Sequence, residues 1–197
     1  MSWLMLLAAL IADPRPTASG DVPTAQEANW TLCRNEKGTI SVGDEIKGCE
    51  ALIAANDVDN EIKAIAHTNR GMLMGQMSFF ETAKSELDEA IRLDPKLAPA
   101  YYNRALLLAA TDDPKSAVDD YSMAISILPK MVEAYVNRGI IYAKSDQSAL
   151  ALADFSKAIE LEPGNADNYE NRGQLLHKMG RVTEAMADMH MAMELAK

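Results

Sequence analysis

The sequence repeats itself with a period of 34 residues between positions 64 and 197. The four copies cover residues 64–97, 98–131, 132–165 and 166–197, and the third reads VEAYVNRGIIYAKSDQSALALADFSKAIELEPGN. A fixed period of this length, with small and aromatic residues recurring in phase, is typical of arrays of helical hairpins. The chain is therefore predicted to be all-α. A repeat array of this kind does not by itself name a function.

Each copy is expected to form two antiparallel helices. In the third copy the first helix is predicted at Val132–Lys144 and the second at residues 147–161. We expect Ser145 and Asp146 to supply N-cap oxygens for the second helix, and Pro163 with its flanking residues to end it.

Two columns of small residues predict close contacts between the paired helices. One column holds Gly71, Ala105, Gly139 and Gly173, and the facing column holds Ala83, Ala117, Ala151 and Ala185. Small residues on both sides allow two helix axes to approach to about 8 Å. Larger residues in phase with them, such as Leu87 and Phe155, are expected to fill the spaces beside these contacts.

An arginine stands at one position of every copy, and an acidic residue follows it sixteen positions later. A buried charge without a partner costs several kcal/mol, so each arginine in a core-facing column needs one. We predict four structural ion pairs: Arg70–Glu86, Arg104–Asp120, Arg138–Asp154 and Arg172–Asp188. The alternative is an arginine ladder that binds anions, but paired guanidinium groups would have few donors left for a ligand.

These columns together resemble the tetratricopeptide repeat. The resemblance covers Ala64–Lys197, about two thirds of the chain, and includes a proline near the end of three copies. It departs where the family most often has leucine and this chain has arginine. The resulting Asn-Arg-Gly triplet resembles a variant of bacterial repeat proteins, and the N-terminal half resembles that of exported bacterial members. The resemblance implies a right-handed superhelix of antiparallel helix pairs, an α-solenoid with a concave groove.

The same resemblance implies that the first helices line this groove with one asparagine per repeat. In the O-linked N-acetylglucosamine transferases a comparable asparagine ladder holds an extended peptide, and a carboxamide can both donate to and accept from a peptide bond. The alternative is that these asparagines bond to neighbouring helices. The candidate peptide-binding residues are Asn69, Asn103, Asn137 and Asn171, with Tyr102, Leu106, Val136 and Ile140 beside them.

The N-terminus begins with an apolar run, MSWLMLLAALIA, that is too short to span a bilayer. Its length, the following Asp13-Pro14 and the small residues Ala18 and Gly20 predict a secretory signal peptide over residues 1–20. Residues 21–29 are predicted to be a linker. The protein is therefore expected to be exported, to the periplasm of a bacterium. The alternative is an uncleaved leader that anchors it to a membrane.

The two cysteines, Cys33 and Cys49, both precede the repeats. An even number of cysteines that follow a predicted export signal predicts one disulfide. The alternative is two separate buried thiols. Residues 30–63 are predicted to form a disulfide-closed cap. It would contribute a single helix from Asp44 to Asn56, half a repeat, because residues 30–43 contain two glycines and a strand-like alternation.

Composition and motifs exclude several classes of function. The 29 acidic and 19 basic residues give a net charge of −10, which disfavours binding to nucleic acid or to anionic membranes. No glycine-rich phosphate loop, nucleophile elbow or metal-ligand spacing is present. We therefore expect no catalytic activity, no cofactor and no small-molecule substrate.

A stripe of Met186, Met189, His190 and Met193 marks the last predicted helix, at the spacing of one helical face. Thioether and imidazole groups could bind copper(I), but methionine is more often an adaptable core residue. A third interpretation is a surface for self-association or for a partner.

The sequence therefore predicts a non-catalytic scaffold that binds a protein or an extended peptide in its groove. The alternatives are a periplasmic copper-handling protein and an accessory protein of an enzyme.

Overall fold

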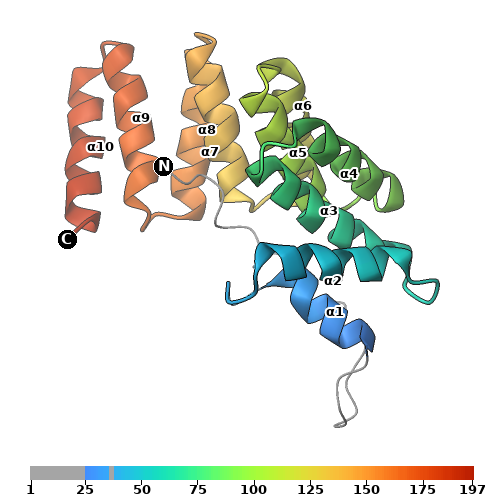
Figure 1. Ribbon diagram of the computed structural model, residues 1–197. Coiled ribbons are helices and arrows are strands. Elements are labelled where there is room, and N and C mark those ends of the chain that lie inside the picture. Colours follow the sequence, from blue (N-terminus) through green and yellow to red (C-terminus); the bar gives the residue numbers. More distant parts are fainter. Residues whose placement is uncertain (1–24, 36–37) are drawn as a thin grey trace. The chain divides into compact units, whose positions relative to one another are not determined.

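The computed structural model describes residues 25–35 and 38–197, and every regular element within them is an α-helix (Figure 1). The helices fall into two units, with the boundary between Asp112 and Asp113. The first unit contains α1 (Ala25–Arg34), α2 (Val42–Ala54), α3 (Asn60–Gln76), α4 (Phe80–Leu93) and α5 (Ala98–Ala110). The second contains α6 (Pro114–Ile127), α7 (Val132–Lys144), α8 (Ser148–Leu161), α9 (Ala166–Lys178) and α10 (Val182–Leu195). The predicted all-α repeat fold is confirmed.

The helices pack as the 34-residue period requires. Helices α3 and α4, α7 and α8, and α9 and α10 form hairpins, and α5 and α9 each pack on the hairpin before them. The small-residue columns lie at the hairpin contacts. A Cβ atom at Gly139 would lie 2.8 Å from the Phe155 ring, and one at Gly71 would lie 2.9 Å from Leu87. Because real Cβ contacts are longer than this, these positions allow the close approach that the sequence predicts.

The hairpin turns differ from our expectation at Asp146. Four residues that share one position of the period have positive φ angles: Ser78 (65°), Asp112 (63°), Asp146 (57°) and Gly180 (76°). Asp146 therefore does not cap α8; Gln147 is the N-cap residue, without a side-chain hydrogen bond. The carboxylate of Asp146 instead accepts a hydrogen bond from Lys178 Nζ at 2.7 Å. Glycine and short polar residues tolerate this left-handed conformation, which explains the composition of the column.

The N-terminal cap also differs from the prediction, because it is a complete helical hairpin. Helix α1 begins at Ala25, inside the predicted linker, and α2 begins at Val42, before the predicted start. The apparent strand pattern before Gly43 is a helix start, in which Ser41 Oγ accepts the N–H of Asp44. Asn35 closes the intervening loop with hydrogen bonds to both backbone groups of Ile40. The predicted signal peptide and the linker residues 21–24 lie outside the described residues.

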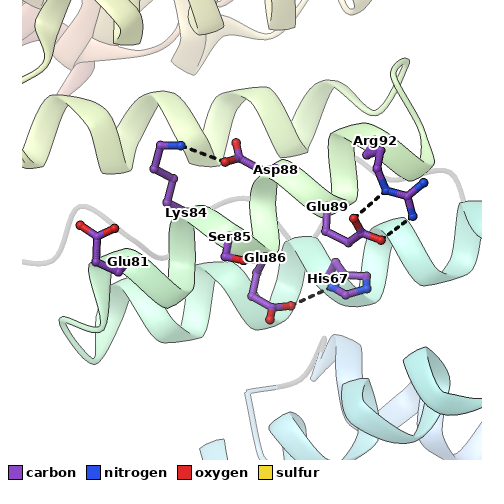
Figure 2. A pocket seen from close by; sticks show the side chains of 8 residues that line it. All are labelled: His67, Glu81, Lys84, Ser85, Glu86, Asp88, Glu89 and Arg92. Carbon is purple, nitrogen blue, oxygen red and sulfur yellow. Dashed lines mark hydrogen bonds and ion pairs between the residues drawn. The ribbon is translucent and has the colours of Figure 1, made fainter.

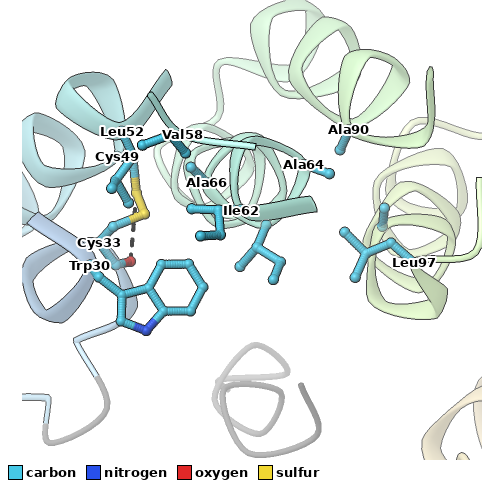
Figure 3. Packing of buried hydrophobic residues seen from close by; sticks show 12 residues of the cluster. Trp30, Cys33, Cys49, Leu52, Val58, Ile62, Ala64, Ala66, Ala90 and Leu97 are labelled. Atoms are coloured by element: carbon cyan, nitrogen blue, oxygen red, sulfur yellow. Dashed lines mark hydrogen bonds between the residues drawn. A yellow bond between two sulfur atoms is a disulfide. The ribbon is translucent and has the colours of Figure 1, made fainter. Parts of the chain in front are cut away.

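A buried cluster holds the cap against α3 (Figure 3). A disulfide joins Cys33 of α1 to Cys49 of α2, and both residues are fully buried. Trp30, Leu52 and Ile62 pack around this disulfide. The cap therefore supplies an apolar surface for the first hairpin of the repeats.

Gly48 is the glycine of the cap with the least space around it. A Cβ atom there would lie 2.5 Å from Leu32 Cβ, 2.8 Å from the Cys33 nitrogen and 2.9 Å from the Asn29 carbonyl oxygen. Backbone atoms cannot move aside as a flexible side chain can. We expect Gly48→Ala to lower the free energy of unfolding by about 1–3 kcal/mol, as overpacking does. Denaturant unfolding can measure this, with Gly43→Ala as control because that site is open. Equal effects of the two changes would contradict it.

Candidate functional site

Three of the four predicted arginine pairs lie within single units, and the structure brings each of them together. In each pair the guanidinium Nε and Nη2 atoms donate to the two carboxylate oxygens. The Nε and Nη2 distances are 3.0 and 2.7 Å for Arg70–Glu86, 2.9 and 2.8 Å for Arg138–Asp154, and 2.7 and 2.8 Å for Arg172–Asp188. This two-point geometry is the strongest that arginine forms with a carboxylate. The fourth pair, Arg104–Asp120, would join the two units and stays a prediction.

The remaining amino group of Arg138 and of Arg172 contacts the helix that precedes the hairpin. Nη1 of Arg138 donates to Ser122 Oγ at 2.8 Å, and Nη1 of Arg172 donates to Ser156 Oγ at 3.2 Å. Nη1 of Arg104 donates to Asp88 at 2.6 Å. These acceptors lie sixteen residues before the arginine, whereas the acids paired with Arg138 and Arg172 lie sixteen residues after it. Each of these two side chains therefore links its own hairpin to the helix before it, a contact that we did not predict from the sequence.

Aromatic rings complete the surroundings of two arginines. The guanidinium of Arg104 lies 5.7 Å from the centre of the Tyr101 ring, and that of Arg138 lies 5.8 Å from the Tyr135 and Tyr142 rings. The hydrogen bonds to Asp154 raise the pKa of Arg138, and burial opposes them. The guanidinium donors of Arg138 are therefore engaged with partners inside the chain.

A charged pocket of about 580 Å³ lies on α3 and α4 (Figure 2). His67 stands there at the position where later repeats have tyrosine, and its Nδ1 lies 2.8 Å from Glu86 Oε2. Burial would raise the pKa of Glu86, but the hydrogen bonds from His67 and Arg70 outweigh it and lower that pKa below its usual value. Lys84 pairs with Asp88, and Arg92 pairs with Glu89. The charges of these paired side chains therefore largely compensate one another.

The four candidate asparagines have different surroundings, although they share one position of the period. Asn69 Nδ2 donates to the backbone carbonyl of Cys33 at 3.3 Å, near the end of α1. Asn103 is buried, and its Nδ2 donates to the carbonyl of Pro99 in its own helix at 3.0 Å. Asn137 is half-buried and has a partner. Asn171 is half-buried, and among the described residues its side chain has no hydrogen bond.

The apolar candidates beside the asparagines also divide between the units. Tyr102 on α5 is buried, and Leu106 is half-buried. On α7, Val136 and Ile140 are half-buried, and Ile140 packs against the cluster around Phe155. Helices α7 and α9 contact each other, so Val136, Asn137 and Asn171 belong to neighbouring first helices of one unit. We call these three residues the α7/α9 face.

Two further observations concern metals and membranes. Among the described residues, no group of three or more His, Cys, Asp or Glu side chains is arranged to hold a metal ion. The three methionines considered for copper, Met186, Met189 and Met193 on α10, are exposed. None of the described helices combines the length and apolar character needed to cross a bilayer.

Hairpins that repeat every 34 residues and are linked by paired arginines define a helical repeat protein. Models of the tetratricopeptide repeat match residues 68–132, 132–165 and 155–187. The chain belongs to the tetratricopeptide repeat family. No curated protein matches the sequence.

Several solved structures share the fold. A crystal structure of MamA superposes with a TM-score of 0.72 and 20% sequence identity, over 89% of this chain and 96% of that chain. MamA from Desulfovibrio magneticus RS-1, from residue 41 to its end, superposes with a TM-score of 0.73 and 16% sequence identity, over 88% of this chain and 96% of that chain. YrrB, described as a TPR protein with an unusual peptide-binding site, superposes with a TM-score of 0.66 and 19% sequence identity, over 87% of this chain and 84% of that chain. At such identities the likeness shows the fold alone.

Proposed function

We propose that the protein is a non-catalytic scaffold that holds an extended segment of another protein against its first helices. The observation that carries the proposal is the hydrogen bond from the Asn69 carboxamide to the Cys33 carbonyl. In that contact, an asparagine of the repeated column already binds a main-chain oxygen. Because a carboxamide matches the donor and acceptor pattern of a peptide bond, the same column can bind the main chain of a partner.

The α7/α9 face is the part of the column best suited to a partner. Asn69, Asn103 and Asn137 all have partners within the chain, whereas Asn171 has no hydrogen bond among the described residues. Val136 offers a half-buried apolar surface beside Asn137. The peptide-binding site described for YrrB, a protein with the same fold, adds support by analogy. Since the chain carries a net charge of −10, a neutral or basic segment suits it best.

Replacing Asn137 and Asn171 together should weaken peptide binding without unfolding the protein. Peptides selected from a random phage-displayed library on the full chain serve as the probe. We expect Asn137→Ala/Asn171→Ala to lower their affinity about tenfold, the effect of losing two hydrogen bonds. Gln147→Ala is the control, because this exposed side chain makes no cap hydrogen bond. Fluorescence polarisation measures the affinities, and circular dichroism checks the fold.

A photo-cross-linking amino acid locates the site independently. Placed at Val136, it should capture the selected peptide, whereas placed at Leu150, an exposed position on α8, it should not. Selected peptides that bind the double variant as tightly as the wild type, or that cross-link from Leu150, would refute the proposal.

We also propose that the protein works in an oxidising compartment outside the cytosol. The disulfide between Cys33 and Cys49 supports this, because structural disulfides are rare in reducing compartments. The predicted signal peptide lies outside the described residues, so N-terminal sequencing of the mature protein is the direct test. Retention of Met1 would contradict cleavage.

A further inference from the structure

The outer face of α10 is the largest set of exposed apolar side chains on one helix of the second unit. Met186 and Met193 are 66% and 61% exposed, Met189 is 39% exposed, and His190 is exposed beside them. Residues three and four apart share one side of a helix. We call these four residues the α10 stripe.

Helix α8 shows how the equivalent face is packed in the preceding repeat. The residues of α8 that stand 34 positions before the stripe are Leu152, Phe155, Ser156 and Ile159. Phe155 is 2% exposed and packs with Leu175 of α9, and Leu152 packs against the same cluster. Ser156 accepts a hydrogen bond from Arg172 of α9. In α8 this face packs partly on α7, at Gly139, and partly on α9, at Leu175. In α10, Met189 keeps the equivalent contact with Gly173 of α9, but no described helix covers the stripe from its other side.

The stripe has a geometry that fits a copy of itself. In two antiparallel α10 helices related by a twofold axis between positions 189 and 190, Met186 of one copy faces Met193 of the other. Met189 and His190 then lie next to the twofold axis, each beside its counterpart in the other copy. An isologous contact of this kind requires one self-complementary patch, and a stripe at these four spacings provides it. Methionine suits such a contact, because its unbranched side chain adapts its shape to a neighbour.

The charges around the stripe do not oppose a second copy. Glu184 pairs with Arg181, Glu194 pairs with Lys197, and Asp188 is held by Arg172. The acidic groups of α10 are therefore compensated within the chain, although the whole chain carries −10. Nor does the stripe offer unpaired charges that would select a strongly charged partner.

We propose that two copies of the chain associate through the α10 stripe, with the two α10 helices antiparallel. This surface is separate from the α7/α9 face, so each copy would present its peptide-binding face independently. A contact made by one helix per copy is small, and we expect an association with a dissociation constant on the order of micromolar.

Sedimentation of the full chain up to roughly 0.2 mM tests the association. Met189→Glu should weaken the dimer at least about tenfold, because it places like charges in a contact that excludes water. Met191→Glu is the matched control, because Met191 is 43% exposed on the same helix but faces away from the stripe. A monomeric wild type at every concentration, or equal weakening by the two changes, would overturn the proposal.

Single cysteines test the antiparallel arrangement. Cys33 and Cys49 are bonded to each other, and the described residues include no free cysteine that could interfere. Identical residues at 189 would lie about 1.5 Å apart along the helix axes, so Met189→Cys should cross-link with itself. At 186 the separation is about 10 Å, beyond the reach of a disulfide. Met186→Cys should therefore cross-link only when mixed with Met193→Cys, and self-cross-linking of Met186→Cys would overturn the arrangement.

Discussion

Asp154→Ala is expected to lower the free energy of unfolding by about 3–5 kcal/mol, the cost of breaking a buried ion pair from one side. The side chains of Asp154 and Arg138 are only 8% and 17% exposed. Removing the carboxylate leaves Nε and Nη2 of Arg138 without acceptors, while Nη1 keeps its bond to Ser122. The guanidinium cannot lose its proton, so it stays charged and partly desolvated.

Two further variants separate this effect from a general loss of contacts. Glu160→Ala removes the partner of Lys157 on the surface of the same helix, where both side chains are more than one third exposed. An exposed pair of this kind contributes about 0–1 kcal/mol. Arg138→Leu added to Asp154→Ala should recover part of the lost stability, because it removes the stranded charge. Urea unfolding followed by circular dichroism measures all three. An Asp154→Ala protein no less stable than Glu160→Ala would contradict the role assigned to the pair.

The arginine positions also show which contacts a sequence with this period reveals. The acid sixteen residues after each arginine is visible, because both belong to one copy and recur four times. The acceptor sixteen residues before it is harder to recognise, since it changes from Asp88 to Ser122 and Ser156. In the sequence, a serine that accepts such a hydrogen bond looks the same as any other small residue at a hairpin contact. The link from a hairpin to the helix before it therefore became evident only from the structure.

The cap and the turns were mispredicted for local reasons. Residues 39–42 alternate like a strand, but four residues are too few to decide between a strand and a helix start. Asp146 is a good N-cap residue by composition, yet it is also one of the few residues that tolerate positive φ. In the cap, Asn35 holds Ile40 and Ser41 caps α2, and at the turn Lys178 binds the Asp146 carboxylate.

The sequence predicts that the four candidate asparagines share one position of the repeat. It does not predict that their surroundings differ. The period places Asn69, Asn103, Asn137 and Asn171 at one position, but it carries no information on which groups each side chain contacts. Asn69 faces the end of α1, which is not a copy of the repeat, and Asn103 follows a proline four residues earlier. Differences in these neighbours therefore make the four asparagines unequal, which the period alone does not show.

Removing the disulfide should destabilise the first unit much more than the second. Cys33 and Cys49 are 16 residues apart, and closing a loop of that length contributes about 3 kcal/mol in the chain-entropy model. We expect Cys33→Ser/Cys49→Ser to lose stability of this order. Because Asn69 donates to the Cys33 carbonyl, a loosened α1 would also lose its contact with α3.

Hydrogen exchange resolves this loss by segment. Backbone amides of α1 and α2 should exchange faster in the double variant, and those of α8 should keep their protection, because α8 belongs to the other unit. A reducing agent should give the wild type the exchange pattern of the double variant and leave the double variant unchanged. Equal loss of protection in α2 and α8 would mean that the disulfide stabilises the whole chain rather than the cap. Unchanged protection in α1 would mean that Trp30, Leu52 and Ile62 hold the cap without it.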